Sequence, residues 1–203
     1  MLKISDQRYI LKTVKSLVPS ILTEINFTHT IKEPGHSFSG PFEDMLVNEL
    51  LAVSSDFAAP TAVRSLDEIS YKGQLINIKF GYKKKGQPNL CSFHRIFNRL
   101  HEDVLDSYYI LSFDISGSNK YEVDYYFFDL YENLEYCSFN YGTGQLMLKE
   151  AHIKKDYSFL KKSDLTKKGK MKMLGILAED AFKQHIALKR AQQEKIESVI
   201  NGY

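Results

Sequence analysis

The sequence has no tryptophan, two cysteines, five prolines and no long apolar run. Cys91 and Cys137 lack the spacing of a zinc site and are too few for a disulfide framework, which favours a reducing cytosol. No segment reaches the roughly 18 to 20 apolar residues that a transmembrane helix needs. The N-terminus carries charges at every turn and lacks the apolar core of a signal peptide. We therefore expect a cytoplasmic protein without a membrane partner.

The formal net charge is only +2, which does not identify a class of binding partner. Phosphate binding depends on where cations cluster rather than on their sum, so this value neither indicates nor excludes nucleic acid. The length of 203 residues and the hydrophobic content of 43% are sufficient for one globular domain with a substantial core.

Helical spacing of apolar residues predicts several helices. The first covers 6–26, and Pro19 is expected to split or end it. The second starts at Ser39, a candidate N-cap, with Pro41 at an early helical position. A third covers 90–100, and a long polar helix, free of glycine and proline after its start, covers 173–199.

Strands are predicted between these helices. Residues 66–71 and 74–81 form a hairpin around a tight turn at Lys72 and Gly73. Two aromatic strands follow at 108–116 and 121–131, and a shorter strand region with a turn covers 136–153. This order predicts an α/β fold in which helices flank a mixed sheet.

The second hairpin strand contains a lysine that needs an explanation. Alternation places Leu75, Asn77 and Lys79 on one face and Ile76 and Ile78 on the other. Asp67 opens the first hairpin strand, twelve positions before Lys79, so the hairpin can bring the two to the same end of the sheet. A carboxylate beside a lysine is the minimum for Mg²⁺-assisted hydrolysis of a phosphodiester.

The stretch "LDEISYKGQLINIK" resembles the Asp, spacer, (Asp/Glu)-x-Lys hairpin of the PD-(D/E)xK nucleases, specifically of type II restriction endonucleases. The preceding "GPFEDMLVNELL" is similar to the helix that often supplies these enzymes with an extra glutamate. The resemblance covers about residues 39–115. It implies a restriction-endonuclease-like core in αβββαβ order over about 39–148, with helical extensions at 6–26 and 173–199, all in a single domain over 1–203.

On this resemblance, Asp67 matches the metal-binding aspartate, Lys79 the catalytic lysine and Glu43 the helix glutamate. The chain departs from the family at Asn77, which occupies the (Asp/Glu) position. Asparagine offers a metal one neutral oxygen and no charge. The missing carboxylate would come from Glu43, or from Glu68, which alternation directs to the opposite sheet face from Asp67. If neither reaches the site, the chain is a catalytically inactive DNA binder.

The resemblance further implies a prokaryotic, Mg²⁺-dependent endonuclease that cuts double-stranded DNA at a short specific sequence. It implies a homodimer, because palindromic sites mirror a two-fold protein, and a protecting DNA methyltransferase as functional partner. The two terminal helices are candidates for the dimer interface. Two alternatives remain: a structure-selective repair nuclease and a non-catalytic DNA-binding protein on the same fold.

DNA contacts are expected beyond the hairpin. Lysines suit phosphates, and Gln or Asn amides can pair with adenine, although a solvated surface turn explains the same loop residues. Arg95 and Arg99, four apart on the next helix, face either phosphates or solvent. The G-x-G stretch at 142–144 lacks the helix that follows the glycines of a dinucleotide site, so it predicts a turn near DNA. The candidate loop and turn residues are Lys83, Lys84, Lys85, Gln87, Asn89, Thr143 and Gln145.

A second cationic segment covers Lys161 to Lys172, and its polarity and Gly169 predict a mobile loop that orders on DNA. His94, His101, His152 and His185 share no spacing, so we expect them to be surface or core residues rather than zinc ligands.

Overall fold

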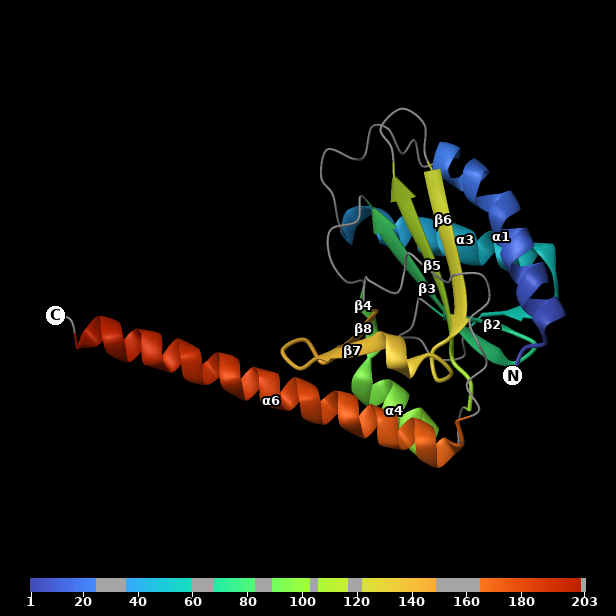
Figure 1. Cartoon of the computed structure of the whole chain (residues 1–203). Coiled ribbons are helices and arrows are strands. Elements are labelled where there is room, and N and C mark those ends of the chain that lie inside the picture. Colours follow the sequence, from blue (N-terminus) through green and yellow to red (C-terminus); the bar gives the residue numbers. More distant parts are fainter. Residues whose placement is uncertain are drawn as a thin grey trace.

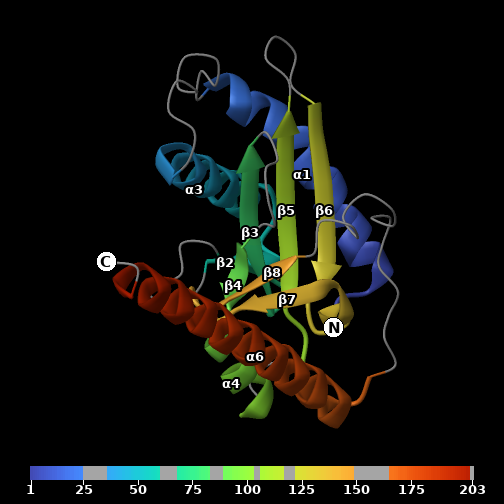
Figure 2. The same cartoon turned by 60° about the vertical axis from the view of Figure 1, so that its left-hand side comes forward.

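The computed structural model describes residues 1–24, 36–59, 68–82, 89–102, 106–116, 122–148 and 165–201. In these parts the chain is a mixed α/β protein whose main sheet is flanked by helices (Figures 1 and 2). The helices are α1 (Ile4–Glu24), α3 (His36–Val53), α4 (Phe93–His101), the short η1 (Leu134–Tyr136) and α6 (Lys167–Ile200). The strands are β1 (Phe57–Ala58), β2 (Glu68–Tyr71), β3 (Gln74–Tyr82), β4 (Asn89–Ser92), β5 (Tyr109–Ser116), β6 (Glu122–Asp129), β7 (Cys137–Asn140) and β8 (Gln145–Leu148).

The main sheet has the strand order β1-β2-β3-β5-β6 within the described residues. Strand β3 is central, antiparallel to β2 and parallel to β5. The predicted hairpin is confirmed, because β2 and β3 are joined at Lys72 and Gly73. Both residues have positive φ, 49° and 76°, as a two-residue turn that matches the strand twist requires.

Helices α1 and α3 cover one face of the main sheet. Their buried side chains pack into one apolar cluster with Ile76 and Ile78 of β3. The expected break at Pro19 is wrong, since α1 continues to Glu24. Val18 and Ile21 on either side of Pro19 are buried in the cluster, and this packing offsets the backbone hydrogen bond that proline removes.

Helix α3 starts earlier than predicted. It begins at His36, so Ser39 and Pro41 lie within the helix, and Ser39 is not its N-cap. Pro41 is the sixth residue of the helix, so α3 continues through the loss of one backbone hydrogen bond, and the proline does not mark where the helix begins. Phe42, Leu46 and Leu50 are fully buried against the sheet, which confirms the predicted apolar face of this helix.

The other face of the main sheet packs against a second layer made of α4, α6 and a small sheet of order β4-β8-β7. The predicted helix over 90–100 begins instead at Phe93, because residues 89–92 pair with β8 as strand β4. Leu90 is fully buried in this second cluster as a strand residue, and its apolar spacing also fits a helix, so the spacing alone did not separate the two.

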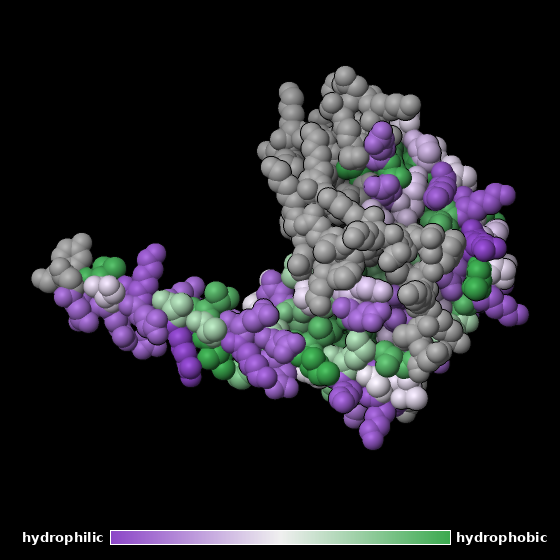
Figure 3. All heavy atoms as spheres, viewed as in Figure 1, coloured by the Kyte–Doolittle hydropathy of each residue, from purple (hydrophilic) through white to green (hydrophobic). Residues whose placement is uncertain are grey.

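Helix α6 corrects the prediction of a loop up to Lys172. The helix begins at Lys167 rather than at 173, and its N-cap Thr166 accepts a hydrogen bond from the Gly169 N–H at 3.2 Å. Lys170 is only 5% exposed and pairs with Glu132, so the segment is held by a contact that composition does not reveal. The C-terminal part of α6 projects from the body as an arm (Figures 1 and 3).

Within the described ranges, no helix is long and apolar enough to cross a membrane. Cys91 and Cys137 are not joined in a disulfide, and both are buried.

Candidate active site on the central strand

Strand β3 places two polar side chains toward the second layer. Ile76 and Ile78 are fully buried against α1 and α3, which confirms the predicted alternation. Lys79, partly buried, lies in register with Ser112 of β5, and Ser112 lies in register with Tyr126 of β6. A row of polar residues therefore crosses three neighbouring strands at the level of Lys79.

Asn77 lies one step earlier on the same face and is only 2% exposed. Its Nδ2 donates a hydrogen bond to the Tyr108 hydroxyl at 2.8 Å, and the Arg99 guanidinium lies 5.8 Å from the centre of the Tyr108 ring. Its Oδ1 is buried and accepts no hydrogen bond from the described residues. A buried acceptor without a donor costs about 1 to 3 kcal/mol, so a hydrogen-bond donor or a cation at this oxygen would stabilise the fold.

Two of the carboxylates predicted to join Asn77 and Lys79 belong to neighbouring residues, Asp67 and Glu68. Glu68 opens β2, and its backbone lies in register with Asn77; its side chain lies outside the described part, as does Asp67. Register thus brings the backbone of Glu68, a candidate replacement ligand, beside that of Asn77, which occupies the (Asp/Glu) position of the motif.

Glu43 lies on α3, which packs against the sheet face opposite to that of Asn77. Its neighbour Phe42 contacts Phe113 with ring centres 5.5 Å apart. Phe113 is in register with Phe80, the residue after Lys79. Helix α3 therefore contacts the sheet, through the residue before Glu43, near the level of Lys79 but from the other layer.

The predicted DNA-facing residues are spread over the second layer. Lys83, Lys84, Lys85 and Gln87 lie outside the described residues, and Asn89 begins β4. Arg95 and Arg99 are partly buried on α4. The predicted turn between strands is confirmed at 141–144, where Thr143 is exposed, and Gln145 begins β8.

Sequence reasoning missed a buried polar cluster where β6 ends. Asp129 is 8% exposed, and its Oδ1 accepts hydrogen bonds from the backbone N–H groups of Tyr108 (3.2 Å) and Tyr131 (3.0 Å). Burial raises the pKa of Asp129 to about 6, although these hydrogen bonds and Lys170 act in the opposite direction. Nearby, Glu132 and Lys170 form an ion pair of 2.6 Å with both side chains buried. An acid within a run of aromatic and apolar strand residues was the available signal.

Asn77 of β3 could contribute one ligand to a metal site. Across the residues that the structure describes, no group of three His, Cys, Asp or Glu side chains is gathered around one point. The Asn77 Oδ1 atom fits the role of one neutral oxygen ligand, because the Tyr108 hydrogen bond fixes the amide and no described residue donates to this oxygen. No protein-family model matches the chain, and no curated protein matches it in sequence.

Proposed function

We propose that this chain is a sequence-specific type II restriction endonuclease of the PD-(D/E)xK superfamily, which hydrolyses phosphodiester bonds in double-stranded DNA with Mg²⁺. The observation that supports the proposal most is the central strand β3. It is paired with β2 in a tight hairpin, runs parallel to β5 and carries Asn77 and Lys79 on one face. The finer fold assignment, a restriction-endonuclease-like core, is part of the same proposal.

Each residue has a defined role in the proposal. Asp67 would hold the metal with Glu43 or Glu68, and Asn77 would add its amide oxygen. Bound Mg²⁺ would polarise the phosphate and lower the pKa of a bound water. The Lys79 ammonium would orient that water and offset the negative charge that develops on the phosphate.

The experiment is direct. The full chain is incubated with phage and plasmid DNA, with and without Mg²⁺. We expect discrete fragments with Mg²⁺ that disappear in Lys79→Ala and persist in Lys12→Ala, a control at an exposed lysine of α1. Absence of discrete fragments, or undiminished cleavage by Lys79→Ala, would contradict the proposal. Cleavage of branched or damaged DNA without sequence-defined bands would identify the structure-selective repair nuclease instead.

Asn77 supports a second candidate, a non-catalytic DNA-binding protein. Its amide is buried, uncharged and hydrogen-bonded to Tyr108, as a purely structural residue would be. This candidate predicts binding to duplex DNA that weakens steeply with salt, without Mg²⁺-dependent nicking. Filter binding at several salt concentrations, combined with a nicking assay on supercoiled plasmid, separates the two.

The proposed function includes a homodimer and a protecting DNA methyltransferase. The exposed apolar side chains on the arm of α6 support the dimer, since such residues are typical of contact surfaces. A methyltransferase gene beside the gene of this chain would support the restriction enzyme against the repair nuclease, which needs no protection of host DNA.

A further inference from the structure

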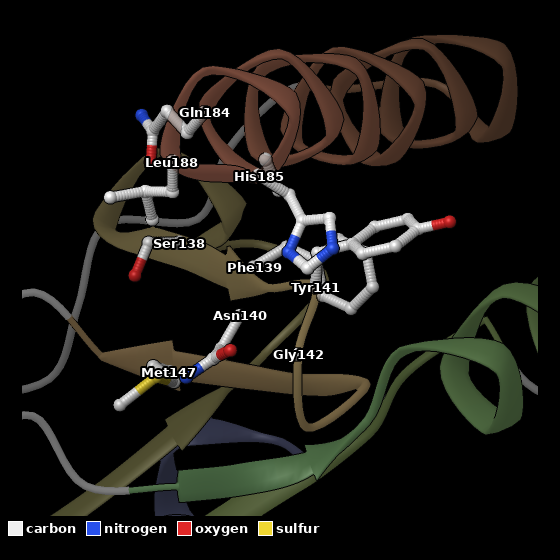
Figure 4. A pocket seen from close by; sticks show the side chains of 10 residues that line it. Ser138, Phe139, Asn140, Tyr141, Gly142, Met147, Gln184, His185 and Leu188 are labelled. Atoms are coloured by element: carbon white, nitrogen blue, oxygen red, sulfur yellow. The ribbon is translucent and has the colours of Figure 1, made fainter. Parts of the chain in front are cut away.

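A pocket of about 440 Å³ lies between the β7–β8 hairpin and α6 (Figure 4). The hairpin contributes Asn140 and Tyr141 to its lining, and α6 contributes Gln184, His185 and Leu188. Pockets that bind small organic molecules have volumes of about 300 to 1,000 Å³. The space is therefore sufficient for a small planar ligand.

One wall of the pocket is aromatic. The rings of Tyr141 and His185 lie 5.0 Å apart, side by side in Figure 4, and Phe182 contacts the Tyr141 ring at 5.6 Å. Phe139 contacts the same ring at 6.1 Å. Tyr141 nevertheless remains 45% exposed, so its neighbours hold the ring while part of it stays open to solvent. Such a ring is a stacking platform for a planar group.

Two amides are among the polar groups of the pocket, which also include the Ser138 hydroxyl and the His185 imidazole. The Asn140 Oδ1 accepts a hydrogen bond from the Thr143 N–H at 3.3 Å, which orients this amide with its NH₂ group available as a donor. Gln184 presents a second amide from the exposed side of α6. Amides offer a donor and an acceptor close together, the pattern that the edge of a nucleobase also carries.

The described lining includes no Asp, Glu, Lys or Arg. A ligand anchored by a carboxylate, a phosphate or an ammonium group would lack a formal countercharge among these residues. An uncharged, planar, heteroaromatic group with hydrogen-bonding edges satisfies both the aromatic wall and the amides.

We propose that this pocket binds a nucleobase, stacked on Tyr141 and His185, with the amides of Asn140 and Gln184 at its edge. The proposal goes beyond the phosphodiester chemistry at β3, because it needs neither Lys79 nor a metal. A base of a free nucleotide and a base of an unpaired nucleic-acid strand share this chemistry, and the experiment distinguishes them.

The test uses the full chain in EDTA. Saturation-transfer NMR measures binding of the four common mononucleotides, and fluorescence anisotropy measures binding of a short labelled single strand. Stacking of one base contributes about 1 to 3 kcal/mol, so Tyr141→Ala should weaken binding by about tenfold. The matched control is Tyr9→Ala, which removes a tyrosine of similar exposure, 41%, that contacts Tyr71 on another part of the molecule.

Binding of mononucleotides that requires Tyr141 would support the pocket and identify a free nucleotide as a ligand. Binding of the single strand alone, again dependent on Tyr141, would support it and identify a nucleic-acid strand. The exposed Gln184→Ala variant repeats the test if Tyr141→Ala does not fold. Lack of binding by every probe, or equal weakening by Tyr9→Ala, would overturn the proposal. Lys79→Ala should bind bases normally, so a failure of the nuclease proposal leaves this result unaffected.

Discussion

Asn77 is the residue that best distinguishes the two proposed functions, a nuclease and a non-catalytic DNA-binding protein. It is buried, donates to Tyr108 and has an oxygen without a donor among the described residues. A carboxylate in its place would carry a negative charge into the protein, where burial is costly unless a cation is bound nearby. The Asn77→Asp variant therefore reports on whether a cation site exists at β3.

We expect Asn77→Asp to lower the free energy of unfolding by about 1 to 3 kcal/mol in EDTA at pH 8, because a buried charge replaces a buried amide. In the nuclease, added Mg²⁺ should restore part of this loss, since a ligand that binds only the folded state stabilises it. Urea unfolding with and without Mg²⁺ measures both values. The control, Asn98→Asp, changes an exposed residue of α4. No Mg²⁺ effect specific to Asn77→Asp would favour the DNA-binding protein.

Asp129 predicts a pH dependence of stability. Its folded-state pKa of about 6 lies above the ordinary 3.8, so the folded protein holds this proton more tightly than the unfolded chain. Its contribution to stability is therefore fully present below about pH 4 and is lost as the pH rises to about 6. The difference of about two units between the folded and ordinary pKa values corresponds to at most about 3 kcal/mol in the free energy of unfolding.

Asp129→Asn should remove this dependence while keeping an oxygen for the Tyr108 and Tyr131 N–H groups. We expect the free energy of unfolding of the wild type, minus that of Asp129→Asn, to fall by about 1 to 3 kcal/mol between pH 4 and pH 7. Urea unfolding of both proteins across this range measures the difference. Parallel pH profiles would show that Asp129 does not titrate in this interval.

At the scale of elements, the β2–β3 hairpin was predictable because its signals are local. Alternation and a Lys-Gly turn lie within 15 residues, and they fixed both the turn and the buried face of Ile76 and Ile78. The start of α6 was not predictable in the same way. It depends on a pairing between Lys170 and Glu132, which lie 38 positions apart in the sequence.

The ion pair of Lys170 and Glu132 joins the start of α6 to the segment that follows β6. Lys170 and Glu132 are buried at 2.6 Å, and the Lys170 ammonium also donates to the Asp106 carbonyl at 3.2 Å. We expect Lys170→Met to cost about 3 to 5 kcal/mol, because it removes the cation that is ion-paired with the buried Glu132 carboxylate. Adding Glu132→Gln should recover most of that loss. Urea unfolding of the wild type, the two single variants and the double variant gives the interaction free energy between Lys170 and Glu132.

The exposed pair of Lys183 and Glu179, 2.7 Å apart on the same helix, serves as a control. Lys183→Met should change stability far less than Lys170→Met, since solvent screens an exposed pair. Strictly additive effects of Lys170→Met and Glu132→Gln would show that the buried pair does not anchor the helix.

At the scale of the whole molecule, the sequence indicated the α/β class but not the layers. The sequence did not show that α3, which carries Glu43, covers one face of the main sheet, or that Lys79 shares the other face with Asn77. Strand β4 joins a separate sheet with β8, more than 50 residues later. Such relations depend on long-range packing, which local periodicity does not encode.

The projecting part of α6 carries exposed apolar side chains. Helix α6 has 34 residues, so its length is about 51 Å. Leu188, Ile196, Val199 and Ile200 lie on one side of it by spacing and are 64%, 59%, 55% and 65% exposed. Isolated apolar side chains are common on surfaces, but a stripe along a projecting helix is typical of a contact with another chain.

We expect the full chain to be a dimer in size-exclusion chromatography with light scattering. The double variant Ile196→Glu and Ile200→Glu should shift it toward the monomer by at least about tenfold in dissociation constant, because two charges would have to be buried in the interface. Ser198→Glu adds a charge to another side of the same helix and should leave the dimer intact. If the nuclease proposal is correct, the monomeric variant should nick one strand of a plasmid where the dimer cuts both, because each copy supplies one Lys79. A dimer unaffected by both glutamates would place the interface elsewhere.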